Sequence, residues 1–408
     1  MRILLVQREL INRCGSELFT IEVSRELSAR GHQVTIYSPR VGDITKMVYG
    51  HGVQVKTRLS DIPWEPEIIH GHHHLHTMAA MARFENTPAI YFCHGPKPWV
   101  ENAPLHPRIQ SYHVNCPWMA VRIEAEFGIE KERIGVIPNF VNLARFSEVR
   151  KPPDQPRRAL LFHGSGFSDA ELRELDRSCL NAGLSLDKIG GAFGNPQPRP
   201  EVFLMAYDLV FAIGKCALEA MSCGCAVVTI LPDLAGNLVD SGNFAQWAHS
   251  NFSPRYFSSG RQISTEWLVE ELKHYDPNEI LKVSAKVRRE HDLDGAVTAL
   301  EAAYEDAISS FVGTPHLREA DFSVYLERLA QEADDLWVQN SSLSKRVDTL
   351  RRQKKELERV VEQALERPNL SPITWFRSRW SLWKRALSRR SSPSSGGRSA
   401  TPSRIAAE

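Results

Sequence analysis

The sequence predicts an α/β protein with two Rossmann-like domains that face a cleft, followed by a C-terminal coiled coil. Three observations lead to this fold class. Short apolar runs alternate with helical stretches, a cluster of prolines interrupts that pattern once, and a leucine repeat follows it. At about 100–200 residues per domain, the 408-residue chain has room for two domains and extensions.

The first predicted domain spans residues 1–150. Ile3–Val6 is an all-apolar run, typical of a central parallel strand. A helix over residues 18–29 follows, and Gly31 suits its C-terminal cap. The next strand is Gln33–Tyr37, and a strand–helix–strand unit requires a parallel sheet. Further strands are predicted at residues 53–55, 68–70, 89–93, 113–115 and 134–137.

The second predicted domain spans residues 151–312 and follows the linker prolines Pro152, Pro153 and Pro156. Ser168 is placed to cap a helix that runs to about Cys179. Another helix covers residues 215–223, and Gly224 closes it. The remaining elements are strands at 159–162, 186–189, 208–213 and 226–230 and helices at 266–275, 277–291 and 295–311.

Residues 320–366 carry a heptad repeat. Its d positions, seven residues apart, are Phe322, Leu329, Leu336, Leu343, Leu350 and Leu357. Its a positions, four residues further on, are Leu326, Ala333, Asn340, Val347, Lys354 and Val361. The repeat predicts a coiled coil, with a long amphipathic helix packed on its own protein as the alternative. Asn340 at an a position favours a parallel two-stranded pairing, so we expect a homodimer.

Residues 370–390 form a basic segment rich in aromatic side chains, without any acidic residue. Phe376, Trp380, Trp383 and Leu387 fall on one face of a helix. A basic amphipathic helix with tryptophans suits the surface of an anionic membrane, whereas docking on protein is the alternative. Residues 391–408 are rich in Ser, Pro, Gly and Arg, which predicts a disordered tail.

Composition excludes several classes of protein. The 50 basic and 49 acidic side chains nearly cancel, so no global field points to nucleic acid. The seven cysteines are scattered and odd in number, unlike those of a disulfide scaffold. The apolar run at the N-terminus is shorter than the core of a signal peptide, and no run approaches the roughly 20 apolar residues that span a bilayer. We therefore expect a cytoplasmic protein, peripheral on the inner face of the membrane if residues 370–390 bind there.

The segment Gly214–Gly224 carries the strongest chemical signal. A strand ends at Gly214, a helix begins at Lys215, and Glu219 follows one turn later. Ligands of open α/β sheets bind at the carboxyl ends of the strands, and a helix N-terminus there offers N–H groups to a diphosphate. Lys215 adds a cation, and Glu219 can accept hydrogen bonds from ribose hydroxyls. The loop Gly164, Ser165 and Gly166 offers further backbone N–H groups for phosphate.

These residues resemble a known family. Gly214–Gly224, with the strand after it, resembles the EAM-x-x-G signature of retaining GT-B glycosyltransferases of the family-4-like group. Residues 14–35 resemble the family's opening G-G-x-E…L-x-x-R-G-H-x-V, and residues 67–72 its D-x-I-H-x-H strand. Residues 91–95 resemble its strand end with His-Gly, and residues 134–146 its I-x-V-I-P-N-G-V-D…F segment. The motifs occur in the family's order over about residues 1–310.

The resemblance implies a GT-B fold and a role for each matched residue. Glu219 would bind the nucleotide ribose, with Lys215 and Gly214 beside the diphosphate. His94 would lie at the reacting sugar as the catalytic candidate. The residues that would line the acceptor side of the cleft are Gly15, Ser16, His72 and Asn139. The only co-substrate expected besides the acceptor is a nucleotide diphosphate-sugar, with no cofactor and no metal. The histidines at 70, 72, 73, 74 and 76 suggest zinc, but no Cys or carboxylate accompanies them in the sequence.

The sequence departs from the family pattern at three places. Cys14 stands where the first glycine usually lies. Phe211 replaces a second Glu, eight residues before Glu219, that reaches the donor sugar in the family. The loop at residues 164–166 lacks the Arg and Lys that clamp the diphosphate.

The function predicted from this resemblance is that of a hexosyltransferase-like enzyme. It would transfer a sugar, with retention, to a glycan or lipid-linked acceptor in bacterial-type surface polysaccharide or glycoconjugate synthesis. The alternative is a non-catalytic GT-B relative that acts as a coiled-coil scaffold or tether. Phe211 and the missing Arg and Lys favour this alternative, whereas His94 and the helix from Gly214 to Glu219 oppose it.

Overall fold

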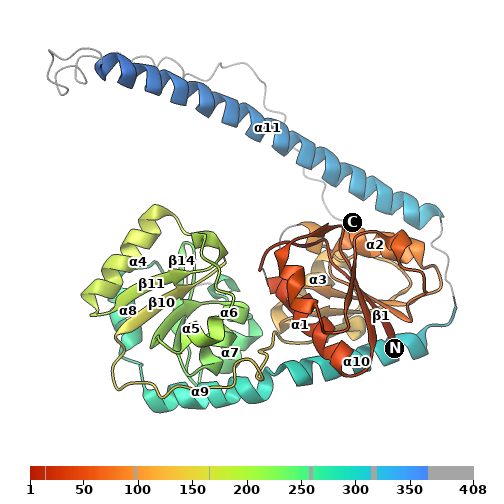
Figure 1. Ribbon diagram of the computed structural model, residues 1–408, viewed down its shortest axis with the longest axis horizontal. Helices are drawn as coiled ribbons and strands as arrows, with labels where there is room; N and C mark the ends of the chain where they lie inside the picture. The colour runs from red at the N-terminus through yellow and green to blue at the C-terminus, as the bar shows by residue number, and fades with distance from the viewer. Residues whose placement is uncertain (14, 96–98, 165, 257–260, 314–318, 366–408) are drawn as a thin grey trace, which may run out of the picture. The chain divides into compact units, whose positions relative to one another are not determined.

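The computed structural model describes residues 1–13, 15–95, 99–164, 166–256, 261–313 and 319–365. The first half of the chain, red to orange in Figure 1, forms a sheet of seven parallel strands. The strand order is β5-β3-β1-β6-β7-β8-β9. These strands are β1 (Arg2–Val6), β3 (Gln33–Tyr37), β5 (Gln54–Lys56), β6 (Ile68–Gly71), β7 (Ala89–Cys93), β8 (Ile109–Val114) and β9 (Ile134–Val136). The helices between them are α1 (Gly15–Ala29), η1 (Asp43–Val48), η2 (Leu59–Asp61), α2 (His74–Arg83), η3 (Trp99–Glu101), α3 (Pro117–Phe127) and η4 (Lys131–Arg133). A separate parallel pair joins β2 (Glu9–Leu10) to β4 (Arg40–Val41).

The central strand β1 shows why its sequence is apolar without alternation. Ile3, Leu4, Leu5 and Val6 have no exposed surface. Because successive side chains of a strand point to opposite faces, Ile3 and Leu5 join the core beneath α1, and Leu4 and Val6 join the core on the other face. Helices cover both faces of such a parallel sheet, so both sets of side chains are buried.

The second half forms a five-stranded sheet in the order β11-β10-β12-β13-β14. The first four strands are parallel, and β14 is antiparallel to β13. The strands are β10 (Arg158–Phe162), β11 (Ser185–Ile189), β12 (Leu209–Ala212), β13 (Ala226–Leu231) and β14 (Leu234–Leu238). The helices are α4 (Asp169–Asn181), η5 (Gly191–Phe193), α5 (Pro200–Leu204), α6 (Gly214–Ser222), α7 (Phe244–His249), η6 (Pro254–Tyr256), α8 (Thr265–Leu272) and α9 (Pro277–Glu290). The prediction of two α/β sheets built on parallel strands is therefore confirmed, with β14 as an antiparallel addition to the second sheet.

In this half of the chain, the sequence predicted the cap of α4 but not the last strand. Ser168 caps α4 as predicted, because its hydroxyl accepts the N–H of Glu171 and the Glu171 carboxylate accepts the N–H of Ser168. Strand β14 was not predicted from the sequence. It returns from β13 through a tight turn in which Asp233 has φ of 63°, and the turn residues break the apolar pattern on which strand prediction depends.

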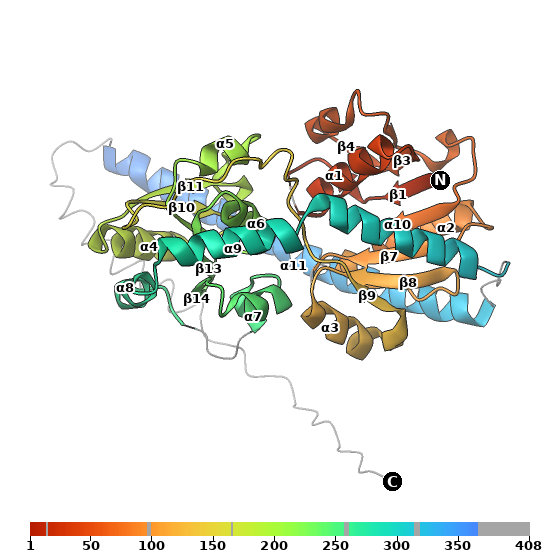
Figure 2. The ribbon, with the colours of Figure 1, turned by 90° about the horizontal axis from the view of Figure 1, so that it is seen from below.

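Helix α10 (Leu293–Ser310) follows the second half in sequence but packs on the first sheet. It contacts α1, β6, β7 and β8, and in Figure 2 it lies over the strands of the first sheet. Leu300 and Tyr304 are fully buried there in the same core as Ile3 and Phe19. The apolar face of α10 thus closes the first domain, although the sequence placed this stretch in the range 151–312.

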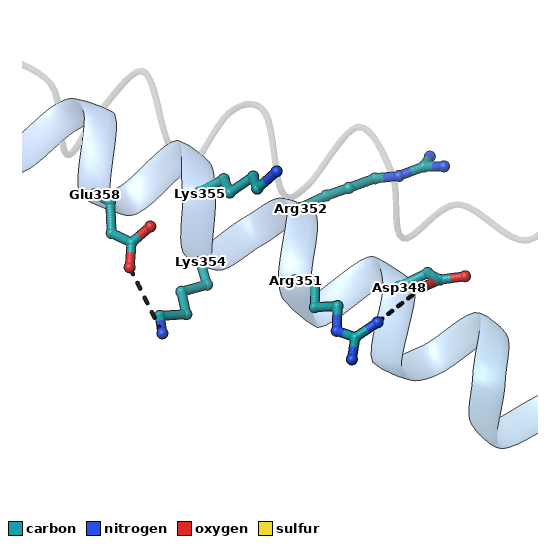
Figure 3. A pocket seen from close by; sticks show the side chains of 6 residues that line it. All are labelled: Asp348, Arg351, Arg352, Lys354, Lys355 and Glu358. Atoms are coloured by element: carbon teal, nitrogen blue, oxygen red, sulfur yellow. Dashed lines mark ion pairs between the residues drawn. The ribbon is translucent and has the colours of Figure 1, made fainter.

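Helix α11 (Glu319–Leu365) belongs to a separate unit of the chain. Five leucines at its heptad positions keep 38–57% of their surface exposed: Leu326, Leu336, Leu343, Leu350 and Leu357. The same helix carries charged pairs: Arg351 Nη1 lies 3.9 Å from Asp348 Oδ1, and Lys354 Nζ lies 3.6 Å from Glu358 Oε1. Figure 3 marks both pairs with dashed lines. The predicted coiled-coil pairing stays a prediction, and the calls on residues 370–390 and 391–408 lie outside the described residues. In the part of the chain that the structure describes, no helix combines the length and hydrophobicity needed to cross a membrane.

Candidate functional site

The turn from β12 into α6 has the geometry that the sequence predicted. Gly214 begins α6 with φ of 52°, a left-handed conformation that favours glycine. Its N–H donates to the carbonyl of Asn251 at 3.1 Å, and a Cβ at this position would lie 3.3 Å from the Asn251 amide nitrogen. Strand end and helix N-terminus therefore meet at Gly214, with Lys215 and Glu219 on the helix that follows.

Glu219 is buried in α6, with 4% of its surface exposed. Burial raises the pKa of its carboxyl to about 7, although the nearby Lys215 ammonium acts in the opposite direction. The distance from Lys215 Nζ to Glu219 Oε1 is 3.9 Å. A carboxylate in this place can accept hydrogen bonds from a ligand in surroundings that exclude water.

Lys215 is engaged by the first half of the chain. Its Nζ donates to Glu22 Oε2 of α1 at 2.7 Å and to the carbonyl oxygen of Phe140 at 2.9 Å. The ammonium also lies 4.6 Å from the centroid of the Phe140 ring, a cation–π contact. The predicted donor-binding cation thus has a carboxylate partner already, contributed by the other domain.

Three further charged residues join this group, and the sequence had not singled them out. Arg145 lies 3.7 Å from Glu22 Oε1, and its Nε and Nη2 donate to Glu201 Oε2 at 3.0 and 2.8 Å. Arg13 lies near enough to Arg145 that the pKa of Arg13 is lowered, first by burial and then by that like charge. The only sequence signal was the position of Arg145 beside Phe146 in the motif at residues 134–146.

The two glycines of the loop after β10 are exposed and have free space around them. Gly164 and Gly166 are exposed, and a Cβ built on either would meet no atom within 4 Å. Before them, His163 is buried and its Nε2 lies 3.2 Å from the carbonyl oxygen of Ile230. Ser165 lies outside the described residues, so phosphate binding by this loop stays a prediction.

Phe211 stands where the resemblance implies a second carboxylate. It lies in β12 with no exposed surface and packs 6.1 Å from the ring of Trp267. The side chain belongs to the hydrophobic core of the second sheet. Its aromatic ring therefore packs in the core at the position where the resemblance implies a ligand-binding carboxylate.

His94, the catalytic candidate, follows the end of β7 and is held on several sides. Its Nε2 lies 2.9 Å from His72 Nδ1, and its backbone N–H donates to Glu101 Oε2 at 3.1 Å. The rings of Phe92 and Phe19 lie 4.7 and 4.9 Å from the His94 ring. Burial lowers the pKa of His94 to about 3, so its imidazole is neutral at pH 7.

The other histidines of this segment have separate partners. His70 Nδ1 lies 2.7 Å from the hydroxyl of Tyr304 on α10, and His73 Nδ1 accepts the N–H of Arg8 at 3.2 Å. His74 Nδ1 lies 3.0 Å from the carbonyl oxygen of Asn102. Among the residues that the structure describes, no three His, Cys, Asp or Glu side chains converge as metal ligands.

Two aromatic rings connect the His94 corner to the Lys215 corner. The Phe19 ring lies 4.9 Å from His94 and 5.1 Å from Phe140, and Phe140 in turn carries the Lys215 ammonium over its face. The catalytic candidate and the donor-binding candidates thus lie on two sides of one aromatic pair.

The remaining predicted residues lie around these corners. Ser16 is in the first turn of α1, next to the exposed Gly15, and its hydroxyl accepts the Gln7 amide at 3.4 Å. The Asn139 amide donates to Asn251 Oδ1 at 2.9 Å, and Asn251 is the residue that binds the Gly214 N–H. Asn139 therefore supports the α6 turn from the first domain. That Gly15, Ser16 and Asn139 line the acceptor side of the cleft stays a prediction.

A hollow elsewhere in the chain does not have the character of this site. Its six lining side chains, Asp348, Arg351, Arg352, Lys354, Lys355 and Glu358, all come from α11 (Figure 3). Within the described residues these side chains belong to one exposed helix, so no second element encloses a ligand there.

Comparisons with known proteins agree with the motif pattern. Residues 14–145 match the family model described as Glycosyltransferase Family 4. A glycosyltransferase structure from Rickettsia africae superposes with a TM-score of 0.56 at 11% identity, covering 76% of this chain and 99% of that one. The Anabaena protein HepE in complex with UDP superposes with a TM-score of 0.51 at 14% identity, covering 75% and 100%. No curated protein matches the sequence.

Proposed function

We propose that this chain, which carries a glycosyltransferase family 4 domain over residues 14–145 in a GT-B fold, transfers a sugar from a nucleotide diphosphate-sugar to a glycan or lipid-linked acceptor. The family match and the fold support glycosyltransferase activity; the donor and the acceptor are our proposal. One observation carries it: the buried Glu219 lies beside Lys215, across the Phe19–Phe140 pair from His94.

The donor would bind at α6. Glu219 would accept hydrogen bonds from the ribose hydroxyls, and Gly214 and Lys215 would receive the diphosphate at the helix N-terminus. Charge builds on the leaving diphosphate in the transition state, and preorganised cations stabilise it. Arg145, held by Glu22 and Glu201, is a second cation in this neighbourhood. For Lys215 to bind phosphate, a phosphate oxygen would replace Glu22 as its partner.

His94 would contact the transferred sugar. Because its imidazole is neutral, it would act through a hydrogen bond rather than through a positive charge. Gly15 and Ser16, at the start of α1, would line the acceptor side. Retention at the anomeric carbon, and a role for this transfer in surface polysaccharide or glycoconjugate synthesis, follow from the family resemblance and belong to the proposal.

The C-terminal region would place the enzyme where its acceptor lies. The exposed leucines of α11 support a homodimer through this helix, and the basic segment at residues 370–390 supports binding to an anionic membrane. Both features suit an acceptor that is anchored in lipid.

A non-catalytic scaffold is the second candidate, and two observations favour it. Phe211 is buried in the core at the position where the resemblance implies a donor-binding Glu. The ammonium of Lys215 is already paired with the carboxylate of Glu22. A scaffold of this kind would keep the fold and the α11 dimer but would bind no donor.

Calorimetric titration separates the two candidates. UDP, GDP and a panel of their sugar conjugates are titrated into the full chain, with UDP first because the Anabaena protein was solved with it. The enzyme predicts binding of at least one nucleotide, abolished in Glu219→Gln and unchanged in Glu305→Gln, an exposed glutamate of α10. Absence of binding by every nucleotide, in a correctly folded protein, supports the scaffold instead.

A further inference from the structure

The contact between His72 and His94 indicates which ring nitrogen of His94 carries the proton. His94 Nε2 and His72 Nδ1 are 2.9 Å apart, and the two rings lie 5.0 Å apart at 32°. One of these two nitrogens must carry the proton that the other accepts. The pKa of His72 is lowered well below its ordinary value by burial, as is that of His94, so both rings are neutral and each carries one proton.

The second nitrogen of His72 distinguishes the two arrangements. His72 has no exposed surface, and its Nε2 has no hydrogen-bond partner among the residues that the structure describes. If His72 accepted from His94, its own proton would lie on Nε2 as a buried N–H without an acceptor. Orphaned N–H groups are rarer in proteins than acceptors without donors. The arrangement that avoids this places the His72 proton on Nδ1, from which it donates to His94 Nε2.

The surroundings hold both rings in this relationship. The His70 ring lies 4.2 Å from the His72 ring and is fixed by the Tyr304 hydroxyl at 2.7 Å. On the other side Phe92 lies 4.7 Å from the His94 ring, and Phe19 contacts both His72 and His94. Reversal of either ring would require this packing to open.

We propose that His72 is a positioning residue that holds His94 in the tautomer with its proton on Nδ1. His94 then presents an N–H donor, rather than a basic lone pair, as its second ring nitrogen. Resting on the proposed function, this makes His94 a hydrogen-bond donor to an oxygen of the transferred sugar or of the leaving diphosphate, and not the base that deprotonates the acceptor.

Nitrogen NMR tests the tautomer without any ligand. The full chain is labelled with ¹⁵N-histidine, and long-range ¹H–¹⁵N correlations, which differ between the two neutral tautomers, are assigned with His72→Asn and His94→Asn. The expected result is the Nδ1–H pattern for both residues. An Nε2–H pattern for His94 would overturn the proposal, whether or not the protein transfers sugar.

Variants test the role of His72. His72→Asn can keep an N–H donor near the place of Nδ1, whereas His72→Leu removes it. We expect His72→Leu to lose the Nδ1–H pattern of His94 and to lower kcat at least about tenfold with little change in the donor KM, since a misplaced tautomer is costly in histidine catalysis. His72→Asn should restore most of both, and His51→Leu, an exposed control, should change neither.

Failure of the His72 proposal can be distinguished from failure of the proposed glycosyltransferase activity. If folded His72→Asn and His72→Leu lose activity equally, or if His94 keeps its Nδ1–H pattern in His72→Leu, His72 does not position His94. If no donor supports turnover by the parent protein, the glycosyltransferase proposal fails, and the tautomer is still decided by the NMR pattern of the unliganded chain.

Discussion

Lys215 Nζ of α6 lies 2.7 Å from Glu22 Oε2 of α1 and so joins the two α/β halves of the chain through a buried ion pair. Glu22 has 2% of its surface exposed, and Arg145 supports its other oxygen at 3.7 Å. The pair lies beside Glu219, so the candidate donor site and the contact between the halves share one set of charges.

Removing both partners of this pair should destabilise the protein by less than the sum of the two single removals. Glu22→Gln or Lys215→Met alone leaves a buried charge without its partner, at a cost of about 3–5 kcal/mol. In urea unfolding, we expect the stability loss of the double variant to be at least about 1 kcal/mol smaller than the sum of the two single losses. The same cycle on the exposed pair Glu270 and Lys273 should show no measurable coupling; equal additivity in both cycles would contradict a structural role for the buried pair.

The raised pKa of Glu219 predicts a pH-dependent stability difference. Its carboxyl titrates near 4.5 when unfolded and at about 7 in the native protein, so the native state binds the proton more tightly. The stability that this proton provides is fully present below pH 4.5 and is lost as pH rises through 7. Glu219→Gln should therefore gain stability relative to the parent between pH 4.5 and 7.

The size of this gain follows from the shift. At about 1.4 kcal/mol per pKa unit, it approaches about 3 kcal/mol and should level off above pH 8. Urea midpoints measured from pH 4.5 to 8.5 check it, with Glu305→Gln as the control. A difference that does not change with pH would mean that the native pKa of Glu219 is ordinary.

Glu101 supports His94 through its backbone, and substitutions should reveal this support. Its Oε2 accepts the His94 N–H at 3.1 Å. Glu101→Gln keeps an acceptor there, whereas Glu101→Met fills similar space without one. We expect the Met variant to be less stable than the Gln variant by about 1–3 kcal/mol, the cost of a buried N–H without its partner. Because neither variant titrates at this position, their difference should be the same at pH 5 and pH 8, and equal midpoints would rule out the proposed support.

The exposed leucines of α11 predict a dimer that charge can break. Leu343 and Leu350 are 57% and 56% exposed in the described chain, and pairing of two copies would bury them at d positions. Leu343→Asp combined with Leu350→Asp should convert a dimer to a monomer in light scattering. Leu180→Asp changes a leucine of α4 that is 75% exposed and lies outside the repeat, so it should leave the mass unchanged. A monomeric parent protein would refute the pairing.

Much of the fold was predictable because its signals are local. The apolar run Ile3–Val6, the cap at Ser168 and the Gly214 turn each reflect the conformation of a few neighbouring residues. Strand β14 was missed, since its turn and its glycine hide the apolar pattern. The packing of α10 on the first sheet was missed as well, because periodicity shows that a helix has an apolar face but not which core receives that face.

Some residues of the candidate site could be named from the sequence, and others only from the structure. Glu219, Lys215, His94 and His72 could be named from the sequence because strand ends and helix starts carry recognisable motifs. Glu22, Arg145 and Glu201 could not, since their partners are far along the chain: Glu22 and Lys215 are 193 residues apart. A lone Glu or Arg on a helix has the same local pattern whether it faces solvent or a buried ion pair.

The sequence by itself therefore determined two α/β sheets built on parallel strands, a helix that begins next to Gly214 with Glu219 in its second turn, and a histidine at the end of β7. Tertiary structure alone decided that Lys215 is paired with Glu22, that Phe211 lies in the core, and that His72 contacts His94. The physical reason is that secondary structure follows from short-range backbone and hydrophobic patterns. The charge and proton state of a side chain follow instead from burial and from partners that only folding brings within hydrogen-bonding distance.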